Sequence, residues 1–140
     1  MTIEDGVMIS AGVIFTNDRY PRATTPDLRQ LRPSEPDENT LATLVREGAT
    51  IGAGSTVGCD LVIGRFAMIG MGSVVTKSVP DFTLALGAPA RNVGYVCRCG
   101  QNLLRFDDQL TPSSTELECS VCGRYYYLAA GTITEPVSDS

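Results

Sequence analysis

The sequence predicts a mostly β protein whose main part is a parallel β-helix of about three coils, followed by a small unit that carries cysteines. Three observations support this prediction. An aliphatic residue recurs at every sixth position between residues 45 and 80, and the same period appears at the start of the chain. A non-periodic segment separates these two stretches, and four cysteines in two close pairs follow near the C-terminus.

The six-residue period defines six consecutive units between residues 45 and 80. Their first positions hold Val45, Ile51, Val57, Ile63, Ile69 and Val75. Their fifth positions, which are mostly small, hold Ala49, Ser55, Leu61, Ala67, Ser73 and Val79. This period fits neither an α-helix nor a single long strand, but it is the repeat of a parallel β-helix with three units per coil. We therefore expect the aliphatic residues to point inward and the small ones to fill the corners.

The same phase begins at Ile3 and breaks in the unit that starts at Phe15, because Arg19 takes a position that should be small. We expect a loop inserted at residues 19–44 within a β-helix that spans residues 1–80. With the loop subtracted, residues 18 positions apart should stack, which places Phe15 beside Val57 and Val75. The same register places Asn17, Cys59 and Lys77 in one column beside the root of the loop. Residues 81–96 form the exit segment.

The strings "CRCG" and "CSVCG" indicate two metal-binding knuckles in a zinc-ribbon-like extension at residues 97–130. Four thiolates suit tetrahedral Zn²⁺, and a glycine after each pair lets backbone amides turn toward sulfur. The predicted ligands are Cys97, Cys99, Cys119 and Cys122. Disulfide pairing is the alternative interpretation of the same residues. Residues 131–140 are expected to form a tail.

Composition narrows the class of protein. A net charge of −5 argues against nucleic-acid binding, which needs clustered cations. The first ten residues do not make a signal peptide, and no segment is long and apolar enough for a membrane span. Cysteines grouped for metal binding fit a reducing, cytoplasmic location. The sequence contains no histidine, which excludes a histidine general base.

The strings "FTNDRYPRA", "TLVREGATIGAGSTV" and "GAPARNVGYVCRCG" resemble the hexapeptide-repeat acyltransferases with a left-handed β-helix. Within them, the resemblance is to N-acetyltransferases that act on UDP-linked 3-amino-3-deoxy-glucuronic acid derivatives. It covers residues 1 to about 100 and implies acetyl-CoA as cosubstrate, a nucleotide-sugar acceptor, and a homotrimer with active sites between neighbouring subunits. Such enzymes carry further coils before the point that matches Met1, so the chain corresponds to their C-terminal part. A truncated chain, a misplaced start and a short natural protein all remain open.

The resemblance also implies roles for particular residues. Asn17 would hydrogen-bond the sugar or the acyl carbonyl, and Asp18 would orient the amine; the alternative is that both only cap a turn. The residues implied for CoA are Gly70, Gly72, Lys77, Ala88, Pro89 and Arg91. For Lys77 and Arg91 the alternative is ordinary solvated surface charge. Cys59 is expected to be a packing residue, because its sequence neighbours include no cation that would lower its pKa.

Without histidine, two mechanisms remain. The amine can reach the thioester already neutral, with a backbone donor stabilising the oxyanion. Otherwise the general base lies in the further coils and this chain is inactive. The predicted function is therefore CoA-dependent N-acetylation of a nucleotide-linked amino sugar, and the alternative is a catalytically inactive, truncated β-helix that serves as a trimerising or partner-binding module.

Overall fold

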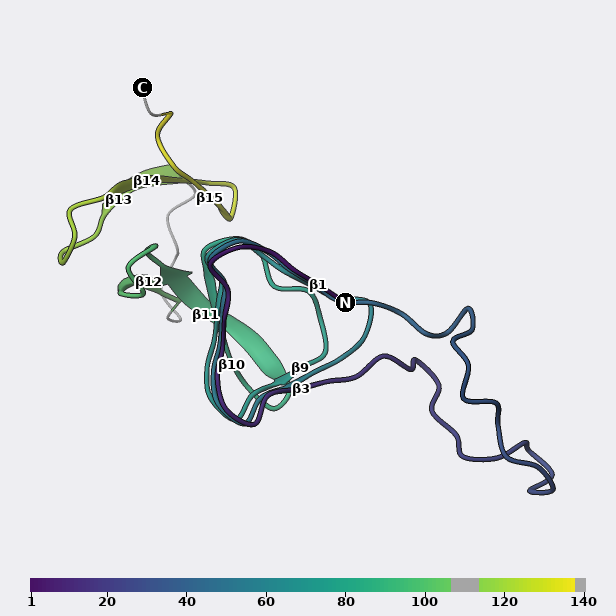
Figure 1. The fold of residues 1–140 in the computed structure, drawn as a ribbon. Helices are drawn as coiled ribbons and strands as arrows, with labels where there is room; N and C mark the ends of the chain where they lie inside the picture. Colours follow the sequence, from purple (N-terminus) through teal and green to yellow (C-terminus); the bar gives the residue numbers. More distant parts are fainter. Residues whose placement is uncertain (107–113, 138–140) are drawn as a thin grey trace.

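The computed structural model describes residues 1–106 and 114–137, and these residues contain strands but no helix. Nine strands of two residues each form three coils that lie over one another in a roughly triangular outline (Figure 1). The first coil holds β1 (Thr2–Ile3), β2 (Met8–Ile9) and β3 (Ile14–Phe15). The second holds β4 (Leu44–Val45), β5 (Thr50–Ile51) and β6 (Thr56–Val57). The third holds β7 (Val62–Ile63), β8 (Met68–Ile69) and β9 (Val74–Val75).

Each side of the coil is a parallel ladder, in the orders β1-β4-β7, β2-β5-β8 and β3-β6-β9. Phe15 pairs with Val57, and Val57 pairs with Val75, so the stacking that the six-residue period predicts is confirmed. The predicted inward positions are buried as well: none of the six aliphatic residues from Val45 to Val75 is more than 1% exposed. The parallel β-helix is therefore the direct consequence of the repeat.

The corners of the coils hold the small fifth residues, and two of these make polar contacts inside the stack. Ser55 donates its hydroxyl to the carbonyl oxygen of Gly70 at 3.1 Å, and the hydroxyl oxygen of Ser55 accepts from the amide of Ser73 at 3.3 Å. Both serines are buried. Their hydroxyls satisfy backbone groups that a corner takes out of the regular ladder.

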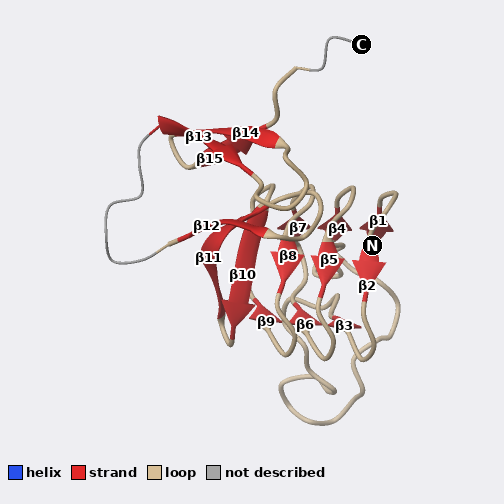
Figure 2. Cartoon of the chain, turned by 90° about the vertical axis from the view of Figure 1, so that its left-hand side faces the viewer, coloured by secondary structure: helices blue, strands red, loops and turns tan. Residues whose placement is uncertain are grey.

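The two ends of the coil stack differ. In the first coil, Ile3 is 44% and Ile9 is 39% exposed, because the strands of this coil pair on one side within the described chain. The third coil is covered by a hairpin of β10 (Thr83–Gly87) and β11 (Ala90–Val96), followed by β12 (Asn102–Arg105). Strand β10 pairs parallel with β8 and antiparallel with β11, which extends one side of the helix to the six-stranded order β12-β11-β10-β8-β5-β2 (Figure 2). The sequence predicts an exit segment at residues 81–96 but not this hairpin within it.

An arm between β3 and β4, residues 16–43, projects away from the coils (Figure 1). Its two limbs are joined near the root, where Asp18 bridges Thr40 and the amide of Leu41 donates to the carbonyl of Asn17 at 2.8 Å. The predicted end of the loop at residue 44 was wrong by one position, because Leu44 already belongs to β4 and pairs with Thr2. The arm is thus a folded hairpin-like segment with few regular pairs.

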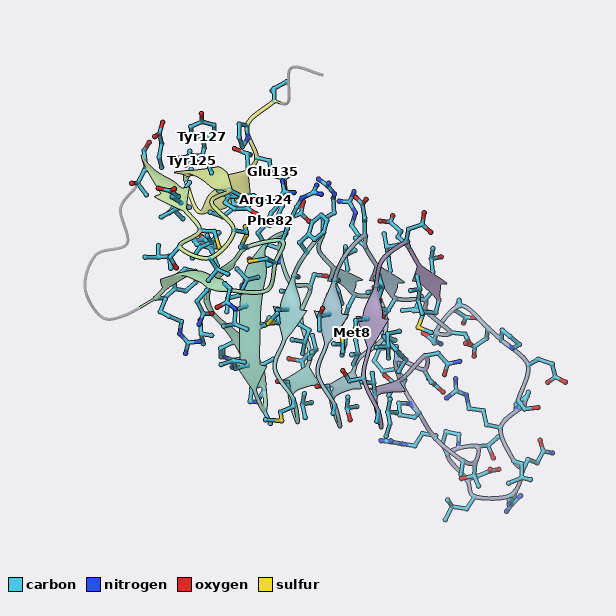
Figure 3. The ribbon with its side chains drawn as sticks, turned by 60° about the vertical axis from the view of Figure 1, so that its left-hand side comes forward. Met8, Phe82, Arg124, Tyr125, Tyr127 and Glu135 are labelled. Carbon is cyan, nitrogen blue, oxygen red and sulfur yellow. The ribbon has the colours of Figure 1, made fainter. Side chains whose placement is uncertain are left out.

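A separate antiparallel sheet follows, made of β13 (Ser114–Glu118), β14 (Tyr125–Ala129) and β15 (Thr132–Thr134). The tail predicted to begin at residue 131 was wrong at its start, since Ile133 pairs with Leu128 and is buried. The part of that tail at residues 138–140 lies outside the described residues. Tyr125 and Tyr127 are exposed, whereas the buried Tyr126 between them packs against Phe82 of the exit segment (Figure 3).

In the part of the chain that the structure describes, there is no helix of the length and apolar character that a membrane span requires.

Candidate functional site

Asn17 lies where the arm leaves the third side of the first coil. The preceding residue, Thr16, still follows the ladder, donating its amide to the carbonyl of Val57 at 3.0 Å. Asn17 then turns into the arm, and its side-chain amide has no hydrogen-bond partner among the described residues. It lines two hollows, one of about 310 Å³ beside the coil and one of about 320 Å³ inside the arm. An exposed, unengaged amide at this point is available to a ligand.

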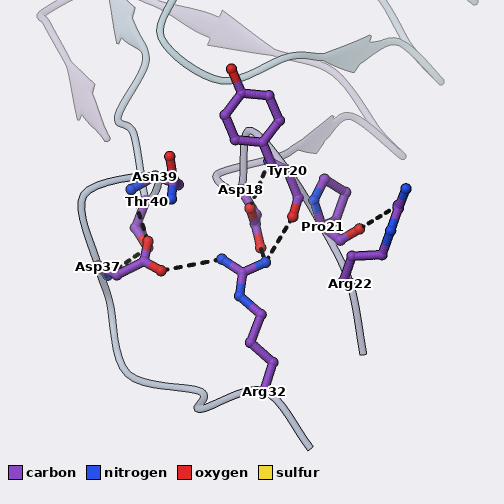
Figure 4. Close-up of polar contacts among 8 residues, drawn as sticks. All are labelled: Asp18, Tyr20, Pro21, Arg22, Arg32, Asp37, Asn39 and Thr40. Atoms are coloured by element: carbon purple, nitrogen blue, oxygen red, sulfur yellow. Dashed lines mark hydrogen bonds and ion pairs between the residues drawn. The ribbon is translucent and has the colours of Figure 1, made fainter. Parts of the chain in front are cut away.

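Asp18 is fully engaged within the arm. Its Oδ1 accepts the amide of Tyr20 at 2.9 Å, which is the turn-capping contact, and its Oδ2 accepts from Arg32 Nη1 at 2.9 Å. Arg32 also donates to the carbonyl of Tyr20 at 2.8 Å and to Asp37 at 3.2 Å, so one guanidinium holds both limbs of the arm (Figure 4). The backbone amide of Asn39, together with Arg32, lowers the pKa of Asp37 from its ordinary value. This arrangement gives Asp18 a structural role that the sequence offered only as the alternative.

The ladder of β3, β6 and β9 ends just before the three positions that the repeat places in one column, Asn17, Cys59 and Lys77. Thr16 pairs with the Val57 carbonyl and Gly58 donates to the Val75 carbonyl at 2.9 Å, so the three positions follow the same side of successive coils. Cys59 and Lys77 line neither of the hollows that Asn17 lines. The divergence of the arm after Thr16 therefore separates Asn17 from the rest of the predicted column.

The exit hairpin lies on the corner that contains Gly70. The amide of Gly70 donates to the carbonyl of Ala85 at 2.9 Å, and Ser73 Oγ donates to the carbonyl of Gly70 at 2.6 Å. The same hydroxyl oxygen accepts the amide of Gly87 at 3.2 Å. A Cβ on Gly70 would lie 2.1 Å from Leu86 Cδ2, so a larger residue here would require the flexible side chain of Leu86 to move.

This corner gathers most of the residues assigned to CoA. Ala88 and Pro89 form the exposed tip of the hairpin beyond Gly87, and Arg91 pairs with Leu86 in the adjoining strand. Gly72 has a φ of 71° with open space around it on the same turn of the coil. Lys77 is exposed and makes no ion pair with any described residue. The structure thus brings together the glycine corner and the "GAPAR" tip but shows no contact of Lys77 with them.

The four paired cysteines converge into one cluster. Their sulfur atoms all lie within 4.8 Å of one another, with 3.4 Å between Cys97 and Cys122 and 3.6 Å between Cys99 and Cys119. Tetrahedral Zn²⁺ with Zn–S bonds of ~2.3 Å needs sulfur atoms ~3.8 Å apart, so the spacing fits the ion. A disulfide needs ~2.05 Å, and all the cysteines are free thiols here.

The backbone around the cluster has the turns that a knuckle requires. The amide of Gly100 donates to the carbonyl of Cys97, and that of Gly123 donates to the carbonyl of Cys119, both at 2.9 Å. Both glycines have positive φ, 89° and 76°. Burial raises the pKa of the Cys97 thiol to about 12, whereas the amides of Cys122 and Val121 lower that of Cys119 to about 6.

Arg98, between the first two cysteines, joins this cluster to the coils. Its guanidinium lies 4.1 Å from the centre of the Phe66 ring and forms a two-pronged ion pair with Glu135, in which Nη2 lies 3.0 Å from Oε2. The Phe66 ring stacks on Phe82, and Phe82 meets Tyr126 edge-on. The sequence does not predict these contacts. The only feature of the sequence that could indicate them is the presence of aromatic residues at the coil corner, Phe66, and in the exit segment, Phe82.

No family model matches the chain. A dTDP-3-amino-3,6-dideoxy-alpha-D-galactopyranose 3-N-acetyltransferase from Aneurinibacillus thermoaerophilus is 43% identical over 93 residues, which make up 66% of this chain and 44% of that enzyme. The serine acetyltransferase of Escherichia coli strain K12 is 52% identical over 50 residues, 36% of this chain and 18% of that enzyme. The chain therefore spans less than half the length of these relatives.

Among solved structures, an N-acyltransferase from Bacillus cereus in complex with dTDP and 3-hydroxybutyryl-CoA superposes with a TM-score of 0.55. The match has 23% sequence identity and covers 69% of this chain and 52% of that one, which supports the fold alone. A structure of a single-site mutant of the same enzyme, with dTDP-4-amino-4,6-dideoxyglucose and coenzyme A, has a TM-score of 0.52 at 22% identity. The repeat, the β-helix and the matched sequence together show that the chain is similar in sequence and fold to hexapeptide-repeat acyltransferases.

Proposed function

We propose that this chain acts as a CoA-dependent N-acetyltransferase on the amino group of a nucleotide-linked sugar. The observation that carries this proposal is the 43% identity over 93 residues with an enzyme that N-acetylates a dTDP-linked amino sugar. The Bacillus cereus N-acyltransferase, which shares the fold, was solved with a dTDP-linked amino sugar and coenzyme A. Its two ligands are of the classes that the proposed reaction combines.

In the proposed reaction the neutral amine of the sugar attacks the thioester carbonyl of acetyl-CoA. A C–N bond forms, the C–S bond breaks, and the amine proton leaves with the CoA thiolate or to water. The sequence supplies no histidine as base, so a backbone donor that stabilises the oxyanion is the route that these residues support. Asn17 has the free amide needed to bind the acceptor, while Asp18 keeps Arg32 and the arm in place.

The exit corner supports the assignment of CoA. The open space at Gly72 and the exposed tip of Ala88 and Pro89 suit the pantetheine arm and the adenine ring, whereas the backbone of Gly70 is engaged by Ala85 and Ser73. Arg91 supplies a cation for a phosphate, because its guanidinium contacts only the carbonyl of Ala90 among the described residues. Lys77, which is exposed and forms no ion pair with the described residues, supplies a second cation.

Calorimetry with CoA on the wild-type chain tests the proposal. Arg91→Ala should weaken CoA about 10- to 100-fold, the effect of losing one charge-assisted contact. Asn17→Ala should leave the affinity for CoA unchanged and reduce turnover of a nucleotide amino sugar. Arg29→Ala, on the arm beside Asp27, is the matched control and should change neither.

If no heat appears at millimolar CoA, the acetyltransferase proposal fails for this chain. A second function would then be favoured, a catalytically inactive module that trimerises or binds a partner. The exposed apolar residues of the first coil, Ile3 and Ile9, are the observation that favours it.

The cysteine cluster supports a structural zinc site with the four ligands that the sequence indicated. All four positions of a tetrahedral ion would be filled by thiolates, which leaves no open position for catalysis. We also infer a cytoplasmic homotrimer, which would allow the arm of one subunit to reach a neighbour.

A further inference from the structure

The arm holds two hollows that share Arg22 and Arg32. One, of about 320 Å³, is lined by Asn17 and polar residues of both limbs. The other, of about 510 Å³, lies farther out and includes Tyr20, Pro26 and Leu28. Both volumes are in the range of small-molecule sites, roughly 300–1,000 Å³. The two hollows together run from the free amide at the arm's root to an apolar region nearer its tip.

The arginines of the arm differ in what they contact. Arg19 pairs with Asp60, and Arg32 is held by Asp18 and Asp37. Arg29 lies 4.0 Å from Asp27. These cations already face carboxylates, which reduces what they can offer to an anionic ligand.

Arg22 is the exception among these arginines. Its Nη1 donates to the carbonyl of Pro21 at 2.9 Å, and no carboxylate of the described residues lies within ion-pair distance of it. It is exposed and lines both hollows. Figure 4 shows its guanidinium directed away from the Arg32 network. A cation with free donors between two hollows is suited to a phosphate.

The outer hollow adds groups that suit a nucleoside. Tyr20 is 65% and Leu28 is 80% exposed, and Pro26 lies between them in the chain. Such rings and aliphatic surfaces pack against a planar base. Thr24 and Asn39 line the same hollow and offer polar atoms for a ribose.

We propose that the arm binds the nucleoside diphosphate portion of the acceptor, with Arg22 on the diphosphate and the outer hollow around the nucleoside. This inference rests on the proposed function and extends it. The order of groups then places the sugar toward Asn17, at the root of the arm. Arg22 is the residue that sets affinity for a diphosphate-linked acceptor over a free sugar.

Calorimetry of the full chain with dTDP, UDP and thymidine tests the inference. Wild-type protein should bind at least one of the diphosphates, and Arg22→Ala should weaken that binding about 10- to 100-fold. Thymidine, which has no phosphate, should bind equally to both proteins. Arg22→Lys should recover part of the affinity that Arg22→Ala loses, because lysine restores the positive charge. Recovery should be incomplete, because the ammonium group lacks the planar, two-pronged geometry of the guanidinium. Arg29→Ala should bind as the wild type does.

Binding of CoA separates this inference from the proposed function. Arg22→Ala should bind CoA as tightly as wild type, which also shows that the variant is folded. If Arg22→Ala keeps the diphosphate affinity while CoA binds normally, the arm assignment is overturned and the acetyltransferase proposal stands. If wild type binds neither diphosphate at millimolar concentration, the assignment is also overturned, and the CoA measurement alone then decides the function.

Discussion

Gly64 shows how closely the third coil approaches the segment that leaves it. A Cβ at this position would lie 2.4 Å from the amide nitrogen of Asp81 and 2.5 Å from the carbonyl carbon of Pro80. Both are backbone atoms, which cannot swing aside as a side chain does. The amide of Arg65 also donates to Asp81 Oδ1 at 2.7 Å, so this contact fixes the start of the exit segment.

Gly64→Ala should therefore lower the free energy of unfolding by ~1–3 kcal/mol, the usual cost of overpacking. Gly58→Ala is the matched control, since its Cβ would meet the carbonyl oxygen of Val75 at 3.2 Å and needs only a small adjustment. Urea unfolding of both variants at one protein concentration measures the difference. Equal midpoints for the two variants would show that the backbone at residues 80–81 can move.

The cysteine cluster and the last coil form one packed unit. Cys97 Sγ lies 3.0 Å from the hydroxyl of Tyr126, whose oxygen also accepts the amide of Arg98 at 3.0 Å. Tyr126 is buried and meets Phe82, which belongs to the exit from the coils. A change at the sulfur atoms is therefore transmitted directly to aromatic packing.

Protein purified without chelator should contain about one Zn²⁺ per chain, the stoichiometry of a four-thiolate site, by elemental analysis. Removing it with a chelator should lower the melting temperature and change the near-ultraviolet circular dichroism of tyrosine, because metal binding contributes to folding. Cys99→Ser with Cys122→Ser should lack the metal and not respond to the chelator. A metal-free wild type with Cys97 and Cys99 oxidised would instead support disulfide pairing.

The sequence determined some elements better than others, for physical reasons. The repeat predicted the coils and the pairing of Phe15 with Val57, because the six-residue spacing leaves one phase that buries every aliphatic first residue. The sequence also predicted that the four cysteines would lie together, because two close pairs of thiols are typical of a metal site. The hairpin of β10 and β11 is not predicted by the sequence, because "TLALG" shows no alternation of apolar and polar residues and its first three residues are all buried.

The arm was the least predictable element of the candidate site. Its order depends on Arg32 reaching Asp18 and Asp37, residues that lie 14 and 5 positions away without any period. Propensity identifies a loop there but not which charges pair. The same limit affected Asp18, whose carboxylate the sequence could assign either to a substrate or to a turn.

The outer faces of the coils carry exposed apolar side chains in places. Ile14 is 58% and Val74 is 38% exposed, and both lie on the side formed by β3, β6 and β9. Met8, on the neighbouring side, is 58% exposed and points outward (Figure 3). Three short coils bury a small core, and such faces gain from contact with further copies.

We expect a sedimentation mass of three chains at micromolar concentration. Ile14→Glu combined with Val74→Glu should lower the mass toward one chain, because burying two carboxylates in an interface is unfavourable. Val121→Glu, at a 66% exposed position among the cysteine knuckles, is the control and should leave the mass unchanged. A wild-type mass of one chain would contradict the trimer.

The one-sided pairing of the first coil also sets the order in which this chain loses its structure. Strand β2 pairs only with β5 among the described strands. The amide of Met8 in β2 donates to the carbonyl oxygen of Ala49 in the second coil. Strand β5 pairs with both β2 and β8, and the amide of its residue Thr50 donates to the carbonyl oxygen of Ala67 in the third coil. In a stack where each layer contacts only the next, opening an end breaks one interface and opening the middle breaks two. Within the described residues, fraying is therefore expected first at the coil of β1, β2 and β3, from which the arm departs, and last at the third coil, which the exit hairpin covers.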